Sequence, residues 1–336
     1  MQRNMRLWVE NILASSHRHA IPIMTHPGID LTGHTVDETV HSPQLHAGAV
    51  RAVARAYQTG ASTMIMDLSV EAEAFGAMVR FSENEVPAVT GRRVHDEESI
   101  EQLAIPNLSQ ARVGQWIEAA RLAAVTITDR PVFAGCIGPF SLAARLYDVT
   151  EIMTAILTEP ETILSLVDKC TRFLITYVKA FKSVGANGIV IAEPVAGVLS
   201  ADLCTQFSSD FIRRIVQSTQ DESFIVVLHN CGDTDSLVPS MHGTGAAALH
   251  FGNRCNITSA LKQLPPGILV LGNLDPVGVF QSGTPETVRT ETDRLLQATK
   301  NFPNYVLSSG CDVPPNVPLT NIDAFFGALA AFNAHR

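Results

Sequence analysis

The sequence predicts an α/β fold: a single (β/α)8 barrel, or TIM barrel, that spans residues 1–336 and has an insertion after its second strand. The length of 336 residues suits one barrel, which needs about 250 residues plus additions. Hydrophobic residues make up 46% and charged residues 17%, so little of the chain can be disordered. Eight apolar runs of strand length, most of them followed by a helical pattern, recur along the chain: 20–25, 63–67, 131–136, 188–193, 224–229, 246–251, 268–273 and 305–309.

Several helices between these runs have recognisable ends. A long helix opens near Thr158, has Pro160 in its first turn and runs to Gly185. Thr284 opens another helix and Ser200 a third. The polar segment 83–112 breaks the pattern because it is too long for a barrel loop. It predicts an excursion over one end of the barrel, either a lid or a packing flap.

The charge balance excludes several classes of partner. The net charge is −9, from 24 basic and 33 acidic residues, whereas nucleic-acid and anionic-membrane surfaces need a basic face. Residues 1–10 mix charged with apolar side chains, unlike a secretory signal, and no stretch approaches the roughly 18 apolar residues of a spanning helix. Six cysteines without close pairing suit a reducing compartment. The sequence therefore predicts a cytoplasmic protein that binds neither nucleic acid nor membrane.

One His and two Cys residues form the most informative pattern. His229 and Cys231 follow the buried run 223–228, and a spacing of two on extended backbone points both side chains to the same face. Cys311 ends a second such run, 305–310. If these runs are neighbouring parallel strands, all three side chains emerge at the same end of the barrel. One His and two Cys with one open position is typical of catalytic zinc, whereas a fourth Cys or His would close a structural site.

Simpler explanations compete with a metal. A buried Cys is usually a small hydrophobic residue, a lone His at a strand end is usually hydrogen-bonded, and a paired CxxC spacing is lacking. However, Asp67, Glu193, His229 and Cys311 all fall at the carboxyl ends of different runs, which is the catalytic face of a barrel. His250 is a further candidate to face this pocket, while Cys136 suits a buried structural thiol. Four histidines are expected to be solvated loop residues: His26, His34, His41 and His46.

These residues resemble the uroporphyrinogen decarboxylase superfamily and, within it, the zinc-dependent methylcobamide:coenzyme M methyltransferase branch. The resemblance covers nearly the whole chain, in the stretches 67–76, 185–188, 228–232, 271–276 and 309–314. The Gly-Asn-Leu-Asp-Pro stretch marks the superfamily, whereas the His-x-Cys-Gly and Gly-Cys stretches mark the methyltransferase branch.

Two departures separate the chain from the decarboxylases that it resembles. Their N-terminal Arg-Gln-Ala-Gly-Arg segment is replaced by residues 24–28, which contain no arginine. Their C-terminal Gly-His-Gly is replaced by residues 310–312, with Cys311 at the centre. A tetrapyrrole with many carboxylates would therefore lack its cationic anchors here.

The resemblance implies methyl transfer from a methylated corrinoid such as methylcobalamin, carried by a corrinoid protein, to a small thiol such as coenzyme M. His229, Cys231 and Cys311 would hold Zn²⁺, and the acceptor would enter the open position as a thiolate. Asn273 and Asp275, in the superfamily stretch, are the expected cofactor-binding residues.

Acidic residues complete the expected site, with Asp67, Glu71 and Glu73 as candidate catalytic residues. Asp67 matches the catalytic Asp of the decarboxylases, so it does not distinguish the branches. Glu71, Glu73 and Glu193 are candidates for a displaceable fourth zinc ligand. Glu71 and Glu73 also suit the first turn of a helix, where carboxylates favour the helix dipole, and Glu193 also suits a loop cap.

Three alternatives remain open on the sequence alone. The methyl group could go to a pterin nitrogen of tetrahydrofolate, the enzyme could be a tetrapyrrole decarboxylase, or the chain could be a catalytically silent barrel with a binding or regulatory role. Metal content separates them, because a silent relative or a metal-free decarboxylase predicts no stoichiometric zinc.

Overall fold

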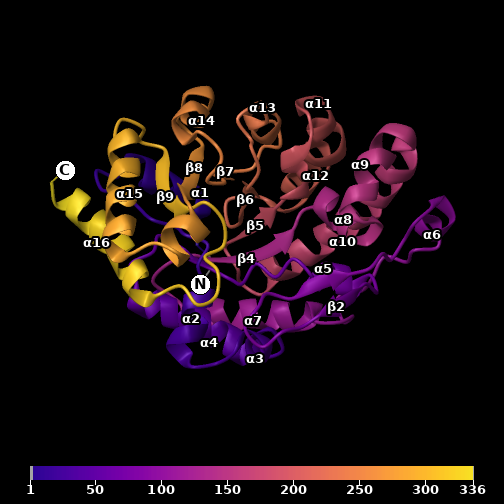
Figure 1. The fold of residues 1–336 in the computed structure, drawn as a ribbon, viewed down its shortest axis with the longest axis horizontal. Helices are drawn as coiled ribbons and strands as arrows, with labels where there is room; N and C mark the ends of the chain where they lie inside the picture. Colours follow the sequence, from indigo (N-terminus) through magenta and orange to yellow (C-terminus); the bar gives the residue numbers. More distant parts are fainter. Residues whose placement is uncertain (1–2, 336) are drawn as a thin grey trace.

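The computed structural model describes residues 3–335. Its centre is a parallel sheet of seven strands in the order β1-β4-β5-β6-β7-β8-β9. The sheet curls around a centre, and helices such as α10, α12 and α15 lie along its outer side (Figure 1). This is the predicted α/β class, with strands β1 (Ser62–Thr63), β4 (Val132–Ile137), β5 (Gly188–Ala192), β6 (Ile225–Asn230), β7 (Ala248–Phe251), β8 (Leu269–Leu274) and β9 (Tyr305–Ser309).

Helices connect the strands, and their predicted starts are confirmed at three places. A helix begins at Pro160, the Ser200 hydroxyl accepts from the backbone N of Leu203, and the Thr284 hydroxyl accepts from that of Thr287. The helices are α1 (Met5–Ala14), α2 (His26–Thr32), α3 (Val36–Val40), α4 (Pro43–Ala56), α5 (Val70–Ala74), α6 (Glu97–Glu101), α7 (Val113–Thr126), α8 (Pro139–Tyr147), α9 (Val149–Thr158), α10 (Pro160–Ser183), η1 (Val195–Val198), α11 (Ala201–Cys204), η2 (Thr205–Ser209), α12 (Asp210–Thr219), α13 (Val238–His242), α14 (Ile257–Gln263), η3 (Pro276–Gln281), α15 (Pro285–Ala298) and α16 (Leu319–Ala334).

The first predicted strand, 20–25, is wrong as a strand. It forms one isolated bridge, between Ala20 and Leu307 of β9. The carbonyl oxygen of Ala20 also accepts a hydrogen bond of 2.8 Å from the backbone N of Gly60, just before β1. An irregular segment therefore lies where the eighth strand was expected, hydrogen-bonded on both sides.

The composition of this segment explains why no ladder forms. Pro22 has no backbone N–H to donate. The backbone N of Met24 donates to the side-chain hydroxyl of Thr63, at 3.1 Å, and not to a strand carbonyl. The second predicted strand, 63–67, is also wrong in its bounds. Strand β1 ends at Thr63, and the backbone N of Ile65 donates to Nε2 of His46 and not to a strand carbonyl.

Alternate residues of the strands fill the inside of the curled sheet. Ile225 and Val227 of β6 belong to this inner apolar cluster, while Val226 and Leu228 belong to the larger cluster shared with the helices. Helix α1 packs on the inner cluster near the amino ends of the strands, with Trp8 edge-on to Phe133 at 5.6 Å between ring centroids. Side chains pointing inward beyond these apolar layers therefore emerge at the carboxyl ends of the strands.

The segment after β1 contains an antiparallel hairpin, β2 (Met78–Arg80) and β3 (Ala88–Thr90), followed by α6. Lys169 of α10 fastens α6 to the body of the protein, because its Nζ donates to the carbonyl oxygens of Ile100, Glu101 and Leu103 at 2.7, 2.8 and 2.9 Å. The expected role of this segment as a lid stays a prediction. Within residues 3–335, no helix combines the length and apolar character needed to cross a membrane.

Candidate metal centre

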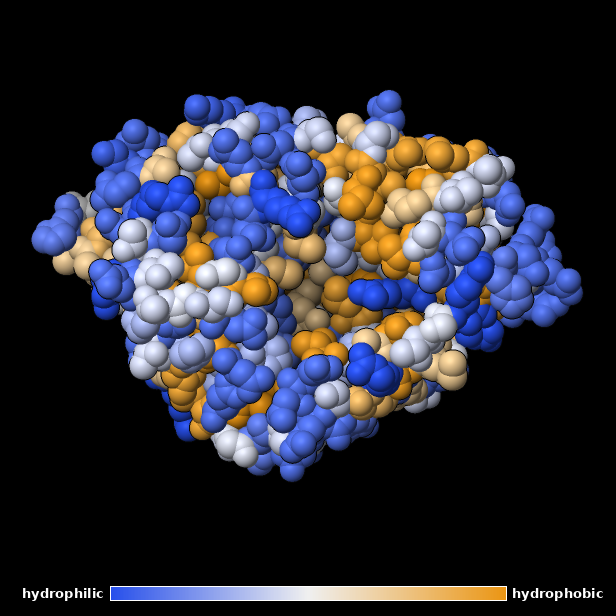
Figure 2. Space-filling model, in the orientation of Figure 1, coloured by the Kyte–Doolittle hydropathy of each residue, from blue (hydrophilic) through white to orange (hydrophobic). Residues whose placement is uncertain are grey.

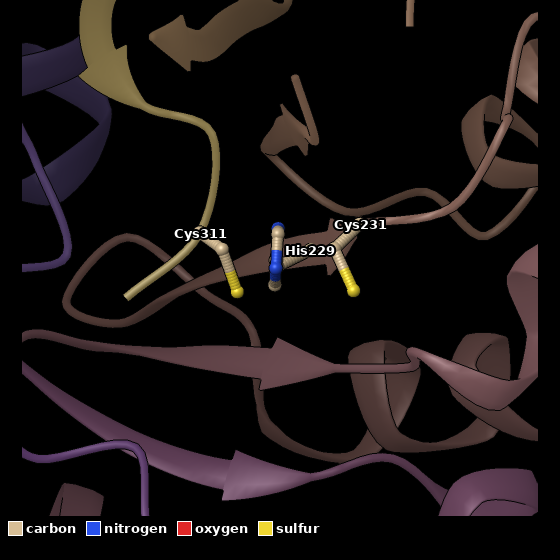
Figure 3. Close-up of side chains that lie close together, drawn as sticks. All are labelled: His229, Cys231 and Cys311. Atoms are coloured by element: carbon tan, nitrogen blue, oxygen red, sulfur yellow. The ribbon is translucent and has the colours of Figure 1, made fainter. Parts of the chain in front are cut away.

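Two strand ends bring the three predicted metal ligands together. His229 continues the inward-facing series of β6, is 2% exposed, and is followed by Cys231 one residue after the strand ends. Cys311 lies two residues after the end of β9. One ligand atom from each residue lies within 4.8 Å of the others. Figure 3 shows both thiols and the imidazole directed into the same space.

Close backbone contacts fix the two loops that carry the thiols. A Cβ atom on Gly252 would lie 2.5 Å from Cα of Cys231, and one on Gly310 would lie 2.6 Å from the backbone N of Asn253. Both distances are shorter than real Cβ contacts allow, so only glycine fits at these positions. The loop after β7 thus packs against the residues beside both cysteines.

The two thiols lie close enough together to shift each other's pKa. The interaction between them is the main cause that lowers the pKa of Cys231 to about 4 and that raises the pKa of Cys311. Burial raises the pKa of both groups, and the nearby imidazole of His229 further lowers that of Cys231. The first of the two protons is therefore lost more easily than the second.

The imidazole carries an atom that needs a partner. Nε2 of His229 is buried and has no hydrogen-bond partner among the described residues. A buried polar atom left unsatisfied costs about 1–3 kcal/mol, and coordination to a metal would satisfy it. One nitrogen and two sulfurs are ligands that Zn²⁺ prefers. The described part of the chain adds no fourth donor to this cluster, so the donor set fits zinc with a position left for another ligand.

The other nitrogen of His229 faces the neighbouring strand. Its Nδ1 lies 2.8 Å from Nδ1 of His250 and 3.3 Å from the carbonyl oxygen of the same residue. Nε2 of His250 lies 2.8 Å from Oγ of Ser308 in β9. His250 therefore faces inward, behind His229, and burial holds its pKa well below the usual value for histidine.

The three candidate catalytic carboxylates lie outside the cluster of ligand atoms found in residues 3–335. Asp67 accepts hydrogen bonds from Ser69 and from Nη1 of Arg112, the latter at 2.6 Å. Glu73 accepts from Nε of Arg112 at 2.7 Å. Sequence reasoning missed Arg112, which is 3% exposed and lies over the rings of Phe81 and Trp116, because no local pattern marks a buried cation.

Glu71 and Glu193 are buried and serve other parts of the barrel. Glu71 accepts a hydrogen bond of 3.2 Å from the backbone N of Ile137, and burial raises its pKa to about 8. Glu193 accepts from the backbone N of Phe140 and the hydroxyl of Ser141, at 2.9 and 2.6 Å, at the start of α8. Burial raises the pKa of Glu193 to about 7. Glu193 therefore caps the start of α8, whereas the sequence suggested a loop cap.

Asn273 and Asp275 hold loops near the centre. Nδ2 of Asn273 donates to the carbonyl oxygens of Gly252 and Cys255, at 2.8 and 2.7 Å. Asp275 caps η3 by accepting from the backbone N atoms of Val277 and Gly278. Their role in cofactor binding stays a prediction.

Two histidines differ from expectation. His26 and His46 are buried, at 1% and 0% exposure, because α2 and α4 pack against each other and the barrel. Nε2 of His46 accepts from the backbone N of Ile65 at 3.1 Å, while Nε2 of His26 lies 3.4 Å from Oδ2 of Asp312. The expectation of solvated loop residues was wrong for this pair.

Comparison with known proteins decides the family. The sequence model of the family described as Uroporphyrinogen decarboxylase (URO-D) matches residues 9–332. The chain belongs to the uroporphyrinogen decarboxylase family. Among relatives of this family member, the methylcobamide:CoM methyltransferase MtbA of Methanosarcina mazei is 28% identical, with 83% of this chain and 84% of the relative covered. The uroporphyrinogen decarboxylase of Neisseria meningitidis serogroup C is 27% identical, with 76% and 73% covered.

Solved structures agree with this assignment at the level of the fold. A methyltransferase from Methanosarcina mazei superposes on this family member with a TM-score of 0.87, 23% identity and 98% of each chain covered. A B12-independent methionine synthase from Shewanella gives 0.61 at 13% identity, with 96% and 97% covered. Sequence identity is nearly equal for relatives with two different activities, so the chemistry of the site has to distinguish them.

Proposed function

We propose that the protein is a zinc-dependent methyltransferase that moves a methyl group from a methylated corrinoid, carried by a partner protein, to a small thiol such as coenzyme M. One observation carries the proposal: His229, Cys231 and Cys311 converge within 4.8 Å, with Nε2 of His229 buried and unpartnered among residues 3–335. Relatives named as methylcobamide:CoM methyltransferases support the same activity.

In this proposal, the residues of the protein hold the metal ion and position the acceptor thiol. A bound Zn²⁺ supplies the acceptor as a thiolate at neutral pH, although a free thiol has a pKa of about 8.5. His229, Cys231 and Cys311 hold the ion at the carboxyl ends of two strands, and the apolar inner cluster fills the barrel beneath them. The acceptor sulfur attacks the methyl carbon in line, a sulfur–carbon bond forms, and the cobalt–carbon bond breaks with its electron pair left on cobalt. The thiol proton goes to solvent.

The corrinoid partner has to approach the face where the strands end. Figure 2 shows that the centre of the viewed face is hollowed, with apolar side chains gathered beside the hollow over α8, α9, α11 and α12. Val149 and Leu157 of α9 and Val198 of η1 are 39%, 69% and 72% exposed. Contiguous exposed apolar side chains are typical of interaction sites, so we assign the docking of the corrinoid protein to this region.

A metal assay followed by turnover tests the proposal. Purified protein should contain about one zinc per chain and should demethylate methylcobalamin when a thiol is added, as followed by absorbance. Cys231→Ser should lose both properties, whereas Cys255→Ser, a matched control at a buried cysteine outside the cluster, should keep both. The proposal would be refuted if protein that was never exposed to a chelator contained no metal.

The same assay separates the alternatives. Turnover with tetrahydrofolate and none with thiols would indicate a pterin acceptor, and the absence of both zinc and turnover on any acceptor would indicate a silent barrel. Decarboxylation of uroporphyrinogen without metal would indicate a tetrapyrrole decarboxylase. That activity is the least supported, since residues 24–28 contain no arginine and the carboxylate of Asp67 is already paired with Arg112.

A further inference from the structure

Three buried residues form a hydrogen-bond chain behind the metal centre. It runs from Nδ1 of His229 to Nδ1 of His250 at 2.8 Å, from Nε2 of His250 to Oγ of Ser308 at 2.8 Å, and from Oγ of Ser308 to the carbonyl oxygen of Ile21 at 2.8 Å. The side chains belong to inward-facing positions of β6, β7 and β9 and are at most 2% exposed. Competition from bulk water is therefore small, and each proton in the chain has a defined place.

The far end of the chain sets the direction of every bond in it. A carbonyl oxygen only accepts, so the hydroxyl of Ser308 donates its single proton to the carbonyl oxygen of Ile21. The same hydroxyl must therefore accept from His250. His250 thus carries its proton on Nε2 and presents a lone pair on Nδ1. Nδ1 of His229 then has to donate, and its second neighbour, the carbonyl oxygen of His250 at 3.3 Å, is also an acceptor. The remaining nitrogen, Nε2 of His229, is left without a proton.

We propose that His250 and Ser308 are positioning residues that hold the proton of His229 on Nδ1, so that the lone pair of Nε2 faces the two thiols. The inference rests on the proposed zinc site and adds the residues that prepare it. Outer groups of this kind fix the tautomer and ring orientation of a ligand histidine, and their loss typically weakens metal affinity by about 10–100-fold.

Ser308→Ala is the sharpest perturbation. It removes the acceptor at Nε2 of His250, so that His250 can carry its proton on Nδ1 instead. His250 can then donate to Nδ1 of His229, which places the proton of His229 on Nε2. The matched control is Ser309→Ala, because Ser309 is the next residue, is equally buried, and its hydroxyl accepts from the backbone N of Ile23 at 3.3 Å without contacting His250.

Two readouts test the proposal. Nitrogen-15 NMR of histidine-labelled, metal-free protein, with the His229 signals assigned by comparison with His229→Gln, should show the proton on Nδ1 in the wild type and in Ser309→Ala. Ser308→Ala should show it at least partly on Nε2. Competition with a chromophoric chelator should give a zinc dissociation constant about 10-fold higher or more for Ser308→Ala, and one unchanged for Ser309→Ala.

Two results would overturn the inference. One is a wild-type His229 with its proton on Nε2, a measurement that requires no variant to fold. The other is a folded Ser308→Ala protein with unchanged His229 tautomer and zinc affinity. Wild-type protein that binds no zinc would instead defeat the proposed function, and the NMR result on metal-free protein would still report the direction of the chain.

Discussion

The guanidinium group of Arg112 lies 2.6 Å from the carboxylate of Asp67, and the two side chains are only 4% and 0% exposed. The same cation binds Glu73 at 2.7 Å and Ser69 at 2.8 Å. Arg112 ends the polar excursion, whereas its partners lie on the loop after β1 and on α5. One buried cation therefore connects the end of the segment 83–112 to the loop after β1 and to α5.

Removing this cation should destabilise the protein strongly. Arg112→Met leaves Asp67 buried without its partner, and breaking a buried ion pair in this way costs about 3–5 kcal/mol. Urea unfolding followed by circular dichroism measures the change. The control is Arg121→Met on α7, where the solvent-exposed pair with Glu118 should contribute nothing measurable. Equal stability of the two variants would show that the Arg112 network is not a stabilising element.

Glu71 should make stability depend on pH in a defined window. Burial raises its pKa from 4.5 to about 8, so between these values the unfolded chain has lost a proton that the folded protein keeps. The free energy of unfolding contributed by this group therefore falls as pH rises through the window, by up to about 1.4 kcal/mol per pH unit. Glu71→Gln should gain stability relative to wild type from pH 5 to pH 8 in urea titrations. The exposed control Glu97→Gln should show a flat difference, and a flat difference for Glu71→Gln would contradict the argument.

The carboxylates near the centre should be dispensable for holding zinc. Asp67→Asn, Glu71→Gln and Glu73→Gln should each retain about one zinc per chain, because none of these residues belongs to the cluster in the described structure. Elemental analysis and thiol titration calorimetry measure both properties. If one carboxylate is the displaceable resting ligand, its variant alone should bind thiol more tightly. Loss of zinc from any of the three would place that carboxylate among the essential ligands.

Thiol binding should release a proton. At pH 7 a free thiol with a pKa of about 8.5 is protonated, whereas zinc binds the thiolate, so zinc-loaded protein should release about one proton per thiol bound. Calorimetry in two buffers of different ionisation enthalpy measures the number. Cys231→Ser is the metal-poor control. Thiol binding to zinc-loaded protein without proton release would contradict activation of the acceptor.

Lys169 should control local order in α6 without controlling global stability. Its three hydrogen bonds end on carbonyl groups at the carboxyl end of α6. Lys169→Met should speed hydrogen exchange at the amides of Gln102 and Leu103, while Lys179→Met, at an exposed position of the same helix, should not. Uniform acceleration over the whole protein would instead show that the contact stabilises the entire fold.

The sequence predicts the metal cluster well because strand geometry is local. A spacing of two residues places His229 and Cys231 on one side of β6 whatever surrounds them. The parallel arrangement then places the end of β9 at the same rim. The structure brings these three residues together as the pattern predicts, although the metal itself is part of the proposal.

What the sequence does not reveal depends on long-range contacts. Arg112 and Asp67 are 45 residues apart, and only the path of the intervening segment makes them neighbours. The run 20–25 has the apolar composition of a strand. However, Pro22 has no N–H to donate to a ladder, and the backbone N of Met24 donates to the hydroxyl of Thr63. His26 and His46 are buried by helices whose packing no local pattern reports.

The irregular segment beside β9 has a consequence for biosynthesis. Cys311 is made long after His229 and Cys231, and the strand that leads to it is held by the backbone of residues 19–21, which are made long before. On the ribosome, His229 and Cys231 therefore emerge as an incomplete pair of donors, and only the return of the later chain to the earlier segment supplies the third. If the centre holds zinc as proposed, loading of the complete three-donor site is a late event in maturation. Stalled or truncated products that stop before β9 would lack the third donor of the proposed site.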